Sequence, residues 1–489
     1  MTTLPDLEVL FAPSIVGGGT GDRLILDVGP ALDTGTLGDG AFFYDISSFV
    51  RTVSVNRGRR RALERFTTGS AQIVLSNLDR RFDPTHSGSP YWNSTVGVSG
   101  VVPSIPIVIR AIWNGTYYPV FRGWIDSWTF DYSPAGKGDA TATIQCSDAM
   151  KVLSNVIGGL PSSTTITSSG TAIYDVGVST IGDSSGFEWV YPASTGSINV
   201  VGDTETTPTI GGGTDLPGTR ISTILDSISW PDNLRDIDPG TVLLAAQNAT
   251  QTPLEMLQEA AEADGGVAYV ESDGTIVFDD RQGLLTNIRS RTSQSTYDTT
   301  DPSGKKFGQT KIVYDDQLIY NVIRIDRKET SQSAGDSLVG TTQIASNAES
   351  ISLYGARFLD LTLPIASSDG ASLTYGQSVA QNLATFLASI YANPELRPEM
   401  IFFQPQQDAS VLWPDLLGRK IRDRITVVFA VPGGGSSISR ECFVESVTHQ
   451  IEPGRWSIEF SLSSASFYTG FFILDDSTFG VLGSNKLAF

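Results

Sequence analysis

Alternating apolar and polar residues predict that much of this chain folds as β-strands. The alternation is clearest at residues 140–147, where Ala140, Ala142, Ile144 and Cys146 are separated by threonine and glutamine. This pattern places Cys146 on a buried face, as a core thiol. Similar runs predict strands at residues 51–55, 72–76, 106–112, 120–132, 311–314 and 321–326.

One helix carries clear start and stop signals. Thr252 as N-cap, Pro253 at the first helical position and Glu255 three residues after the cap form a capping box. Gly265 ends the helix. Residues 267–278, with Ser-Asp-Gly in the middle, then predict a β-hairpin. Helix and hairpin together form a small α+β unit.

Two further segments have apolar residues at helical spacing. Residues 221–230 predict a short helix that Pro231 ends, and residues 373–391 predict a longer one that Pro394 blocks. The remaining sequence is rich in turn-forming residues, with 49 glycines and 24 prolines. We therefore predict a mainly β protein with a few helices.

Two segments repeat the same plan. Residues 106–149 and residues 423–465 each contain three predicted strands of similar length, with a Pro-Gly turn before the last strand. In the second segment Trp456, Ile458 and Phe460 alternate with polar residues, as in the last strand of the first segment. The pattern predicts an internal repeat, although three-stranded meanders are also common by chance.

A chain of 489 residues is too long for one core, so several domains are expected. We predict an N-terminal arm with one strand at residues 23–28, a first β domain, an inserted α+β domain, a second β domain with one helix, and a C-terminal docking segment. Their predicted bounds are 1–40, 41–155, 156–310, 311–466 and 467–489.

Charge is distributed unevenly along the chain. The net charge is −20, yet residues 51–65 carry six arginines against the single acid Glu64. Three explanations stay open for this segment: a solvated loop, nucleic-acid binding, which the acidic whole disfavours, and docking onto an acidic protein surface. Arginine suits docking because its planar guanidinium pairs with carboxylates through two bonds. The candidate interface residues are Arg57, Arg59, Arg60, Arg61 and Arg65.

The last residues of the sequence are unusually aromatic for a stretch too short to form its own core. We expect this segment to be held by another subunit, because apolar residues at this density mark an interface. Its candidate interface residues are Phe467, Phe471, Phe472, Phe479 and Phe489.

No residue pattern predicts catalysis or cofactor binding. The two histidines, His86 and His449, have no cysteine or histidine partner at metal-ligand spacing. The acidic pairs 279–280 and 475–476 lie in turns without a calcium-loop pattern. Two cysteines give no disulfide framework, the first residues do not resemble a signal peptide, and no apolar run is long enough to span a bilayer. We predict no catalytic, cofactor or metal residues and no membrane insertion.

The segments NRGRRRALERF, TTGSAQIVLSN and LDRRFDP, in this order after a strand, resemble the opening barrel of siphophage tail hub proteins, also called minor tail proteins. ECFVESVTHQIEPGRWSIEFSLSSA is similar to the second barrel of that family. The resemblance covers residues 41–155 and 221–470. It implies two similar β-barrel domains separated by an inserted domain.

The resemblance also implies a function and partners. The chain would be a structural hub at the distal tip of a bacteriophage tail, a homotrimer that joins the tail tube and its distal tail protein ring to tip or fibre proteins. It would contact the end of the tape measure protein, and DNA would only pass through its lumen. The protein would be assembled in the bacterial cytoplasm and reside in the virion. Some hubs carry a wall hydrolase after the barrels, but too few residues follow residue 466 here.

Two alternatives belong to other functional classes. A glycan-binding receptor module of the virion would need exposed aromatic residues on one β face, and Trp113, Tyr117 and Tyr118 are candidates. A wall-degrading glycosidase would need two carboxylates in a cleft.

Overall fold

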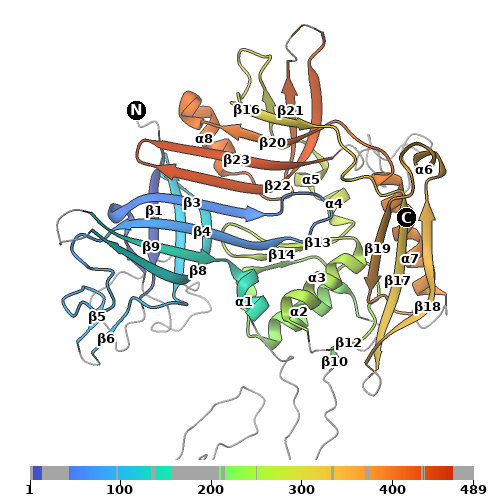
Figure 1. The fold of residues 1–489 in the computed structure, drawn as a ribbon, viewed down its shortest axis with the longest axis horizontal. Helices are drawn as coiled ribbons and strands as arrows, with labels where there is room; N and C mark the ends of the chain where they lie inside the picture. The colour runs from blue at the N-terminus through green and yellow to red at the C-terminus, as the bar shows by residue number, and fades with distance from the viewer. Residues whose placement is uncertain are drawn as a thin grey trace, which may run out of the picture.

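The computed structural model describes residues 4–13, 43–94, 97–133, 139–155, 209–210, 215–248, 251–331, 335–368, 374–430, 433 and 435–465. The prediction of a mainly β protein with a few helices is confirmed. Figure 1 shows a large sheet system on the left and top, and a helical layer with a smaller sheet below and to the right.

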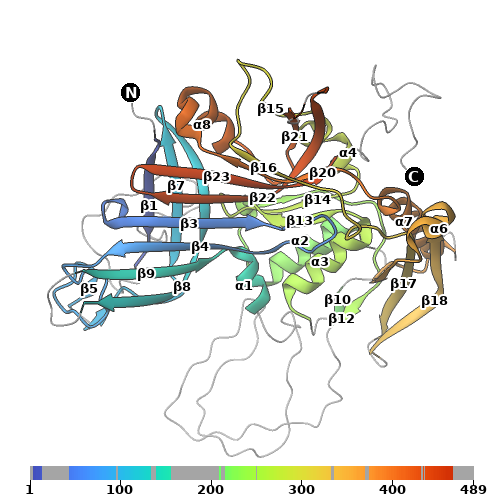
Figure 2. The same cartoon turned by 45° about the horizontal axis from the view of Figure 1, so that its top comes forward.

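The first β domain is an antiparallel arrangement of seven strands. In spatial order they are β3 (Val50–Gly58), β4 (Thr67–Ser76), β9 (Ala140–Ser147), β8 (Thr116–Tyr132), β7 (Pro106–Trp113), β1 (Asp6–Phe11) and β2 (Tyr44–Asp45). In Figure 2, β3, β4 and β9 run across the view while β1 and β7 stand upright, so the sheet turns sharply at β8.

The N-terminal prediction needs a correction. Residues 6–11, assigned to an arm, form β1, which pairs antiparallel with β7 along its whole length. Val9 and Phe11 point into the core and are fully buried, which is why this short apolar segment is held in the sheet. The predicted strand at residues 23–28 lies outside the described residues.

The second β domain repeats the strand order of the first. Its strands are β16 (Gln309–Val313), β20 (Arg397–Phe403), β23 (Arg455–Ser464), β22 (Ile438–Glu452) and β21 (Arg424–Phe429), with β15 (Thr296–Asp298) beside β21. The helix α8 (Ala409–Leu417) follows β20 and buries Trp413 against Trp113 of the first domain. The order β16-β20-β23-β22-β21 therefore corresponds to β3-β4-β9-β8-β7.

The two β domains are not separate bodies. Residues 446–451 of β22 pair antiparallel with residues 53–58 of β3, so all these strands belong to one 13-stranded sheet. A single apolar cluster runs through both domains. The two β domains, predicted as separate barrels, are thus joined edge to edge through β3 and β22.

A second core lies beneath the sheet. It contains α1 (Ala149–Asn155), α2 (Pro217–Ser227), α3 (Pro253–Asp264), the hairpin strands β13 (Val267–Val270) and β14 (Ile276–Asp279), and α7 (Tyr375–Tyr391). β11 (Arg235–Ile237) pairs parallel with β14, and β10 (Thr209–Ile210) pairs with β12 (Gln247–Asn248). The predicted capping box of α3 is present, with the Thr252 hydroxyl accepting from the Glu255 amide.

The boundary predicted at residue 311 differs from the structure on both sides. β15 and β16, at residues 296–313, already belong to the second β domain, because they pair with β21 and β20. In contrast, β17 (Val322–Ser331), β18 (Gly335–Ser346) and β19 (Phe358–Leu363) form a separate sheet that packs with α7 on the second core. The chain therefore leaves the second β domain after β16 and returns at β20.

Smaller elements complete the described fold. They are η1 (Ser47–Phe49), β5 (Trp92–Asn93), β6 (Val98–Ser99), η3 (Asp232–Leu234), α4 (Gly283–Thr286), α5 (Ile288–Arg291), α6 (Ala348–Tyr354) and η4 (Pro405–Asp408). No helix among the described residues is both long and apolar enough to cross a bilayer.

Candidate functional site at the basic loop

The basic loop, residues 57–65, connects β3 to β4 at the junction of the two β domains and the second core. The chain can turn there because residue 58 is glycine. Its φ is +109°, and a Cβ at this position would lie 2.2 Å from the Glu445 carbonyl oxygen. Any other residue would be strained and would clash with the backbone of β22. The turn carries the following arginines over the edge of β22.

Arg59 forms a buried ion pair with the second β domain. Its Nε donates to Glu445 Oε2 at 2.7 Å, while Arg422 Nη1 donates to Glu445 Oε1 at 2.8 Å, and the Ser463 hydroxyl also donates to this carboxylate. The Glu445 side chain is fully buried. Burial alone raises its pKa, but the charges of Arg59 and Arg422 outweigh burial and lower the pKa to about 2.

Two further arginines of the loop also bind acids of this chain. Arg65 pairs with Glu262 of α3 through two bonds of 2.6 and 2.7 Å. Arg61 Nη2 lies 3.6 Å from Glu399 Oε1 on β20. Arg59 contacts Glu445 on β22, as described above. The loop thus contacts β20 and β22 of the second β domain and α3 of the second core.

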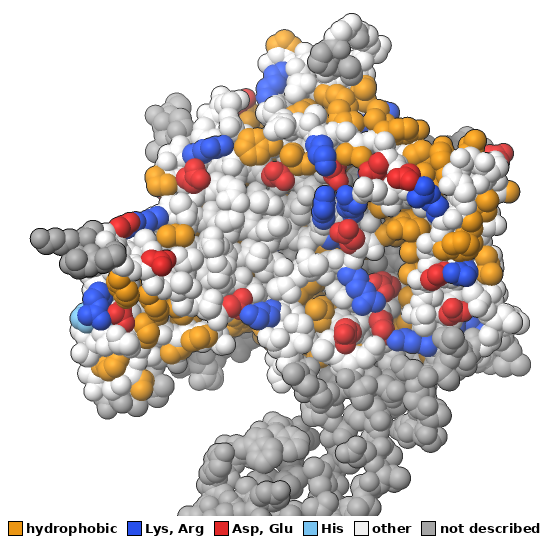
Figure 3. Space-filling view, viewed as in Figure 1, with side chains coloured by type: hydrophobic (Ala, Val, Ile, Leu, Met, Phe, Trp, Pro, Cys, Tyr) orange, Lys and Arg blue, Asp and Glu red, His pale blue; other side chains and the backbone are white. Residues whose placement is uncertain are grey.

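These contacts refine the docking hypothesis. The acidic surface that Arg59, Arg61 and Arg65 meet belongs to the same chain. Arg57 is buried, and Arg60 is exposed. Figure 3 shows basic and acidic side chains interspersed over the middle of this face rather than gathered into one basic patch. Arg65 is also exposed but is paired with Glu262, so Arg60 is the exposed candidate without an ion pair among the described residues.

Arg57 belongs to a second, buried group of charges between β3 and the second core. Burial lowers its pKa, although Glu271, Asp148 and Asp273 favour the charged form. Asp148 accepts from the amides of Gly69 and Met150, at 2.8 and 3.0 Å.

The two buried carboxyls near Arg57 are poorly compensated. Burial raises the pKa of Asp148 to about 7, and it raises the pKa of Glu271 to about 7 although Lys420 and Arg57 act in the opposite direction. Glu271 Oε2 and the Arg57 Nε and Nη1 atoms have no hydrogen-bond partner among the described residues. This group therefore responds to pH near neutrality.

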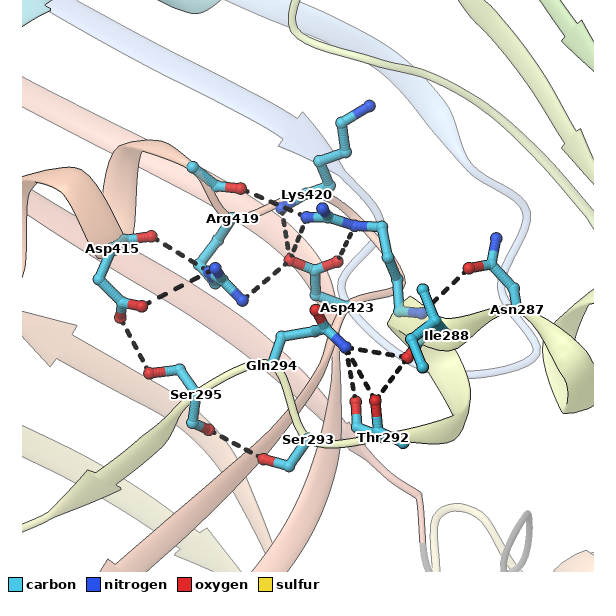
Figure 4. Close-up of polar contacts among 12 residues, drawn as sticks. Asn287, Ile288, Thr292, Ser293, Gln294, Ser295, Asp415, Arg419, Lys420 and Asp423 are labelled. Atoms are coloured by element: carbon cyan, nitrogen blue, oxygen red, sulfur yellow. Dashed lines mark hydrogen bonds and ion pairs between the residues drawn. The ribbon is translucent and has the colours of Figure 1, made fainter. Parts of the chain in front are cut away.

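A third polar network holds α5 and α8 against the second β domain (Figure 4). Arg289 donates to both oxygens of Asp423, at 2.6 and 2.7 Å, and the Lys420 amide donates to Asp423 at 3.0 Å. The Ser295 hydroxyl donates to Asp415, which also binds Lys305 at 2.9 Å. Burial raises the pKa of Asp423 despite Arg289. The network joins residues between 110 and 134 positions apart in the sequence.

Other residues singled out in the sequence are distributed as follows. Trp113 is 7% exposed and packs on Trp413, so it is not open to a glycan. Tyr118 packs against the core, and Tyr117 is half exposed with the Arg110 guanidinium 4.4 Å from its ring centre. The phenylalanines at 467, 471, 472, 479 and 489, and the acidic pair 475–476, lie outside the described residues.

Of the residues singled out for chemistry, His449 and the two cysteines are buried. His449 is buried and accepts from Trp456 Nε1 at 3.2 Å, and burial lowers its pKa to about 3. Both cysteines are buried free thiols. Within the described ranges, no group of three or more His, Cys, Asp or Glu side chains is placed to hold a metal ion.

The acidic half of the site was not predicted from the sequence. Glu445 lies in the run CFVESV, where a lone acid among apolar residues signals a buried charge that needs a cation. Its partners Arg59 and Arg422 are 386 and 23 residues away. The local signal identifies the need for a partner but not which arginine supplies it.

No family model and no curated protein matches this chain. Solved structures do. The 43 kDa tail protein of prophage MuSo2 from Shewanella oneidensis is 12% identical, with a TM-score of 0.46 over 94% of this chain and 99% of that chain. A tail protein from Neisseria meningitidis MC58 is 10% identical, with a TM-score of 0.49 over 95% and 98%.

A third similar structure is the prophage tail protein gp18 from Listeria monocytogenes, which is 10% identical with a TM-score of 0.39 over 87% and 92% of the two chains. At these TM-scores and identities the similarities assign no activity or partner to this chain. All three of these similar structures are described as tail proteins.

Proposed function

We propose that this chain is a structural hub protein at the distal tip of a bacteriophage tail. The observation that carries the proposal is the equivalence of its two β domains, which join edge to edge through β3 and β22. Each copy of such a chain would contribute two neighbouring β domains to a ring. Three copies would present six equivalent β domains around one axis, as a protein must when it joins a six-fold tube to a three-fold tip.

The buried charges support a rigid hub. Arg59, Arg61 and Arg65 tie the junction of the β domains to β20, β22 and α3. Buried ion pairs fix orientation because breaking one leaves an uncompensated charge. The loop would hold the second core, which carries the inserted domain, at a set angle beside the ring.

The partners follow from this position. One face of the ring would meet the distal tail protein ring and the other the tip or fibre proteins, with the tape measure end inside. The net charge of −20 suits a lumen through which DNA passes without being gripped by its phosphates. No enzymatic step is part of the proposal, and the protein would act in the virion after assembly in the bacterial cytoplasm.

Two segments are proposed to contact other molecules. Arg60 is exposed at the tip of the basic loop and would dock onto an acidic neighbour. Residues 467–489, with their five phenylalanines, would be held by another subunit.

The test combines mass and copy number. Size-exclusion chromatography with light scattering on the purified chain should give three times 52.3 kDa. A map of the intact tail tip should then show three copies of the chain and six β domains in one ring. Six copies of the chain in the ring, or one β domain per copy, would contradict the proposal.

A further inference from the structure

Strand β22 shows how a β domain of this chain accepts a neighbour. Along one edge, β22 pairs with β23 for most of its length. Along the other edge, residues 438–443 pair with β21, and residues 446–451 pair with β3 of the other domain. The second half of this long strand is therefore the docking edge of the second β domain.

Strand β8 has the same design but leaves its docking edge open. Residues 116–124 pair with β7, and residues 124–132 pair with β9. Beyond the covered residue Ile125, residues 127–132 have no strand partner on the edge opposite β9 within the part of the chain that the structure describes. An unpaired edge of this length presents free backbone donors and acceptors to another chain.

The matching strand is β16. It occupies the place in the second β domain that β3 occupies in the first, because each lies at the outer edge next to β20 or β4. Among the described strands β16 pairs only with β20. Ile312 is 38% exposed on it, and Tyr314, immediately after it, is 65% exposed. Each copy of the chain thus carries one open docking edge and one open docking strand.

The bulges fix the alignment of the two long strands. β8 skips Asp126 in its pairing with β9, and β22 skips Glu445 in its pairing with β23. Both skipped residues are acids at equivalent positions. Counting five residues onward from each bulge makes Asp131 the counterpart of Gln450.

The ladders fix the alignment of the two docking strands. In the first β domain, the paired residues Ser54, Gln72, Gln145 and Ser127 lead across the sheet from β3 to the residue after the bulge in β8. In the second β domain, the paired residues Lys311, Met400, Ser461 and Ser446 lead in the same way from β16 to the residue after the bulge in β22. Lys311 is therefore the counterpart of Ser54. At the junction within the chain Gln450 lies opposite Ser54 and donates a hydrogen bond to its hydroxyl at 2.7 Å.

We propose that residues 127–132 of one copy pair antiparallel with β16 of the next copy, with Asp131 opposite Lys311. This inference rests on the proposed ring and names its contact between copies. The neutral pair Gln450–Ser54 inside the chain is replaced between chains by an acid opposite a base. Asp131 is exposed and has no ion pair within the described residues, and the Lys311 side chain is 56% exposed although it also forms an ion pair with Glu399 of β20.

Charge complementarity favours β16 of a second copy as the strand that pairs with residues 127–132. Opposite charges on directly paired residues favour the register, whereas like charges disfavour it. Because the open edge and the open strand differ, the contact between copies is head to tail, and three copies related by a closing rotation would form a ring. A second copy of this chain meets both requirements at once.

Charge reversal tests the register. Asp131→Lys and Lys311→Asp should each weaken assembly of the full chain by about fivefold or more per interface, measured by light scattering across a dilution series. The double variant Asp131→Lys, Lys311→Asp should restore assembly toward that of the original chain. Assembly that neither single change weakens would overturn the pairing.

Disulfide trapping gives an independent measurement. Directly paired residues have Cβ atoms about 4.5–5.5 Å apart, so Asp131→Cys together with Lys311→Cys should yield covalent multimers on oxidation. Both native cysteines are buried, and Asp131→Cys with Ser352→Cys, an exposed position on α6, is the matched control. Trimers that form without the 131–311 crosslink would refute this contact but not the hub. A chain that stays monomeric at every concentration, alone and in the tail, would refute the hub itself.

Discussion

Glu445 offers the sharpest test of what holds the two β domains together. Replacing it with glutamine keeps its shape but removes the charge that Arg59 and Arg422 share. In the folded chain the pKa of this carboxyl falls from the ordinary 4.5 to about 2, which corresponds to about 3 kcal/mol of folding free energy near neutral pH. That figure agrees with the roughly 3–5 kcal/mol lost when one partner of a buried ion pair is removed.

The pH dependence follows from the direction of the shift. A carboxyl whose pKa is lowered by folding stabilises the fold fully above its unfolded value, and this stabilisation is lost as pH falls from about 4.5 to about 2. Glu445→Gln should therefore cost about 3 kcal/mol at pH 7 and progressively less below pH 4.5. The exposed pair of Arg65 and Glu262 is the control, since Glu262→Gln should cost less than about 1 kcal/mol.

The assay is denaturant unfolding followed by tryptophan fluorescence at several pH values. Trp413 and Trp456 report on the second β domain, where their ring centres lie 5.4 Å apart. A loss below about 1 kcal/mol at pH 7, or the same loss at pH 7 and pH 3, would refute the assignment of Glu445 as a charged, buried anchor.

Three further outcomes are expected. Glu271→Gln should raise the free energy of unfolding by up to about 3 kcal/mol at pH 8 and by less than about 1 kcal/mol at pH 5. The reason is that folding raises the pKa of this carboxyl from 4.5 to about 7, so the destabilisation that glutamine removes grows as pH rises between these two values. Equal effects at both pH values would contradict this. Arg60→Ala should leave thermal stability unchanged yet weaken tail assembly, whereas Arg59→Ala should lower stability; the reverse order would argue against an exposed docking role for Arg60. Deleting residues 467–489 should give folded protein that fails to assemble, and normal assembly of the truncated chain would contradict a role for this segment.

Local signals in the sequence were sufficient where one segment determines its own structure. The alternation at residues 140–147 gives the bounds of β9, and the capping box gives the start of α3. The apolar spacing of residues 373–391 gives α7, which begins at Tyr375. In each case the periodicity, the cap or the breaking residue lies within the element itself.

Features that depend on distant pairing could not be predicted in the same way. β1 is too short and too isolated by sequence to be distinguished from an arm until β7 is placed beside it. β17 pairs parallel with β19 and packs with α7 rather than with the second β domain, and no local pattern specifies that choice. The basic loop was predicted in part. Its arginine excess is visible in the sequence, but the acids that neutralise it come from 197 to 386 residues away.

The acids at the two bulges, Asp126 in β8 and Glu445 in β22, make the two docking edges different. Each edge therefore favours a different docking strand. At the edge inside the chain, Glu445 pairs with Arg422 of its own domain and with Arg59 of the basic loop, which only β3 brings with it. At the open edge, the equivalent Asp126 is already paired with Lys151 of α1, so it does not need an arginine from another strand. A second copy that offered β3 to the open edge would bring five arginines to a site whose acid is already paired, and would leave its own Glu445 without Arg59. Such an exchange would cost several kcal/mol, since it uncouples a buried charge. β16, which carries no arginine loop, has no such cost at the open edge, and this difference would direct the proposed head-to-tail assembly.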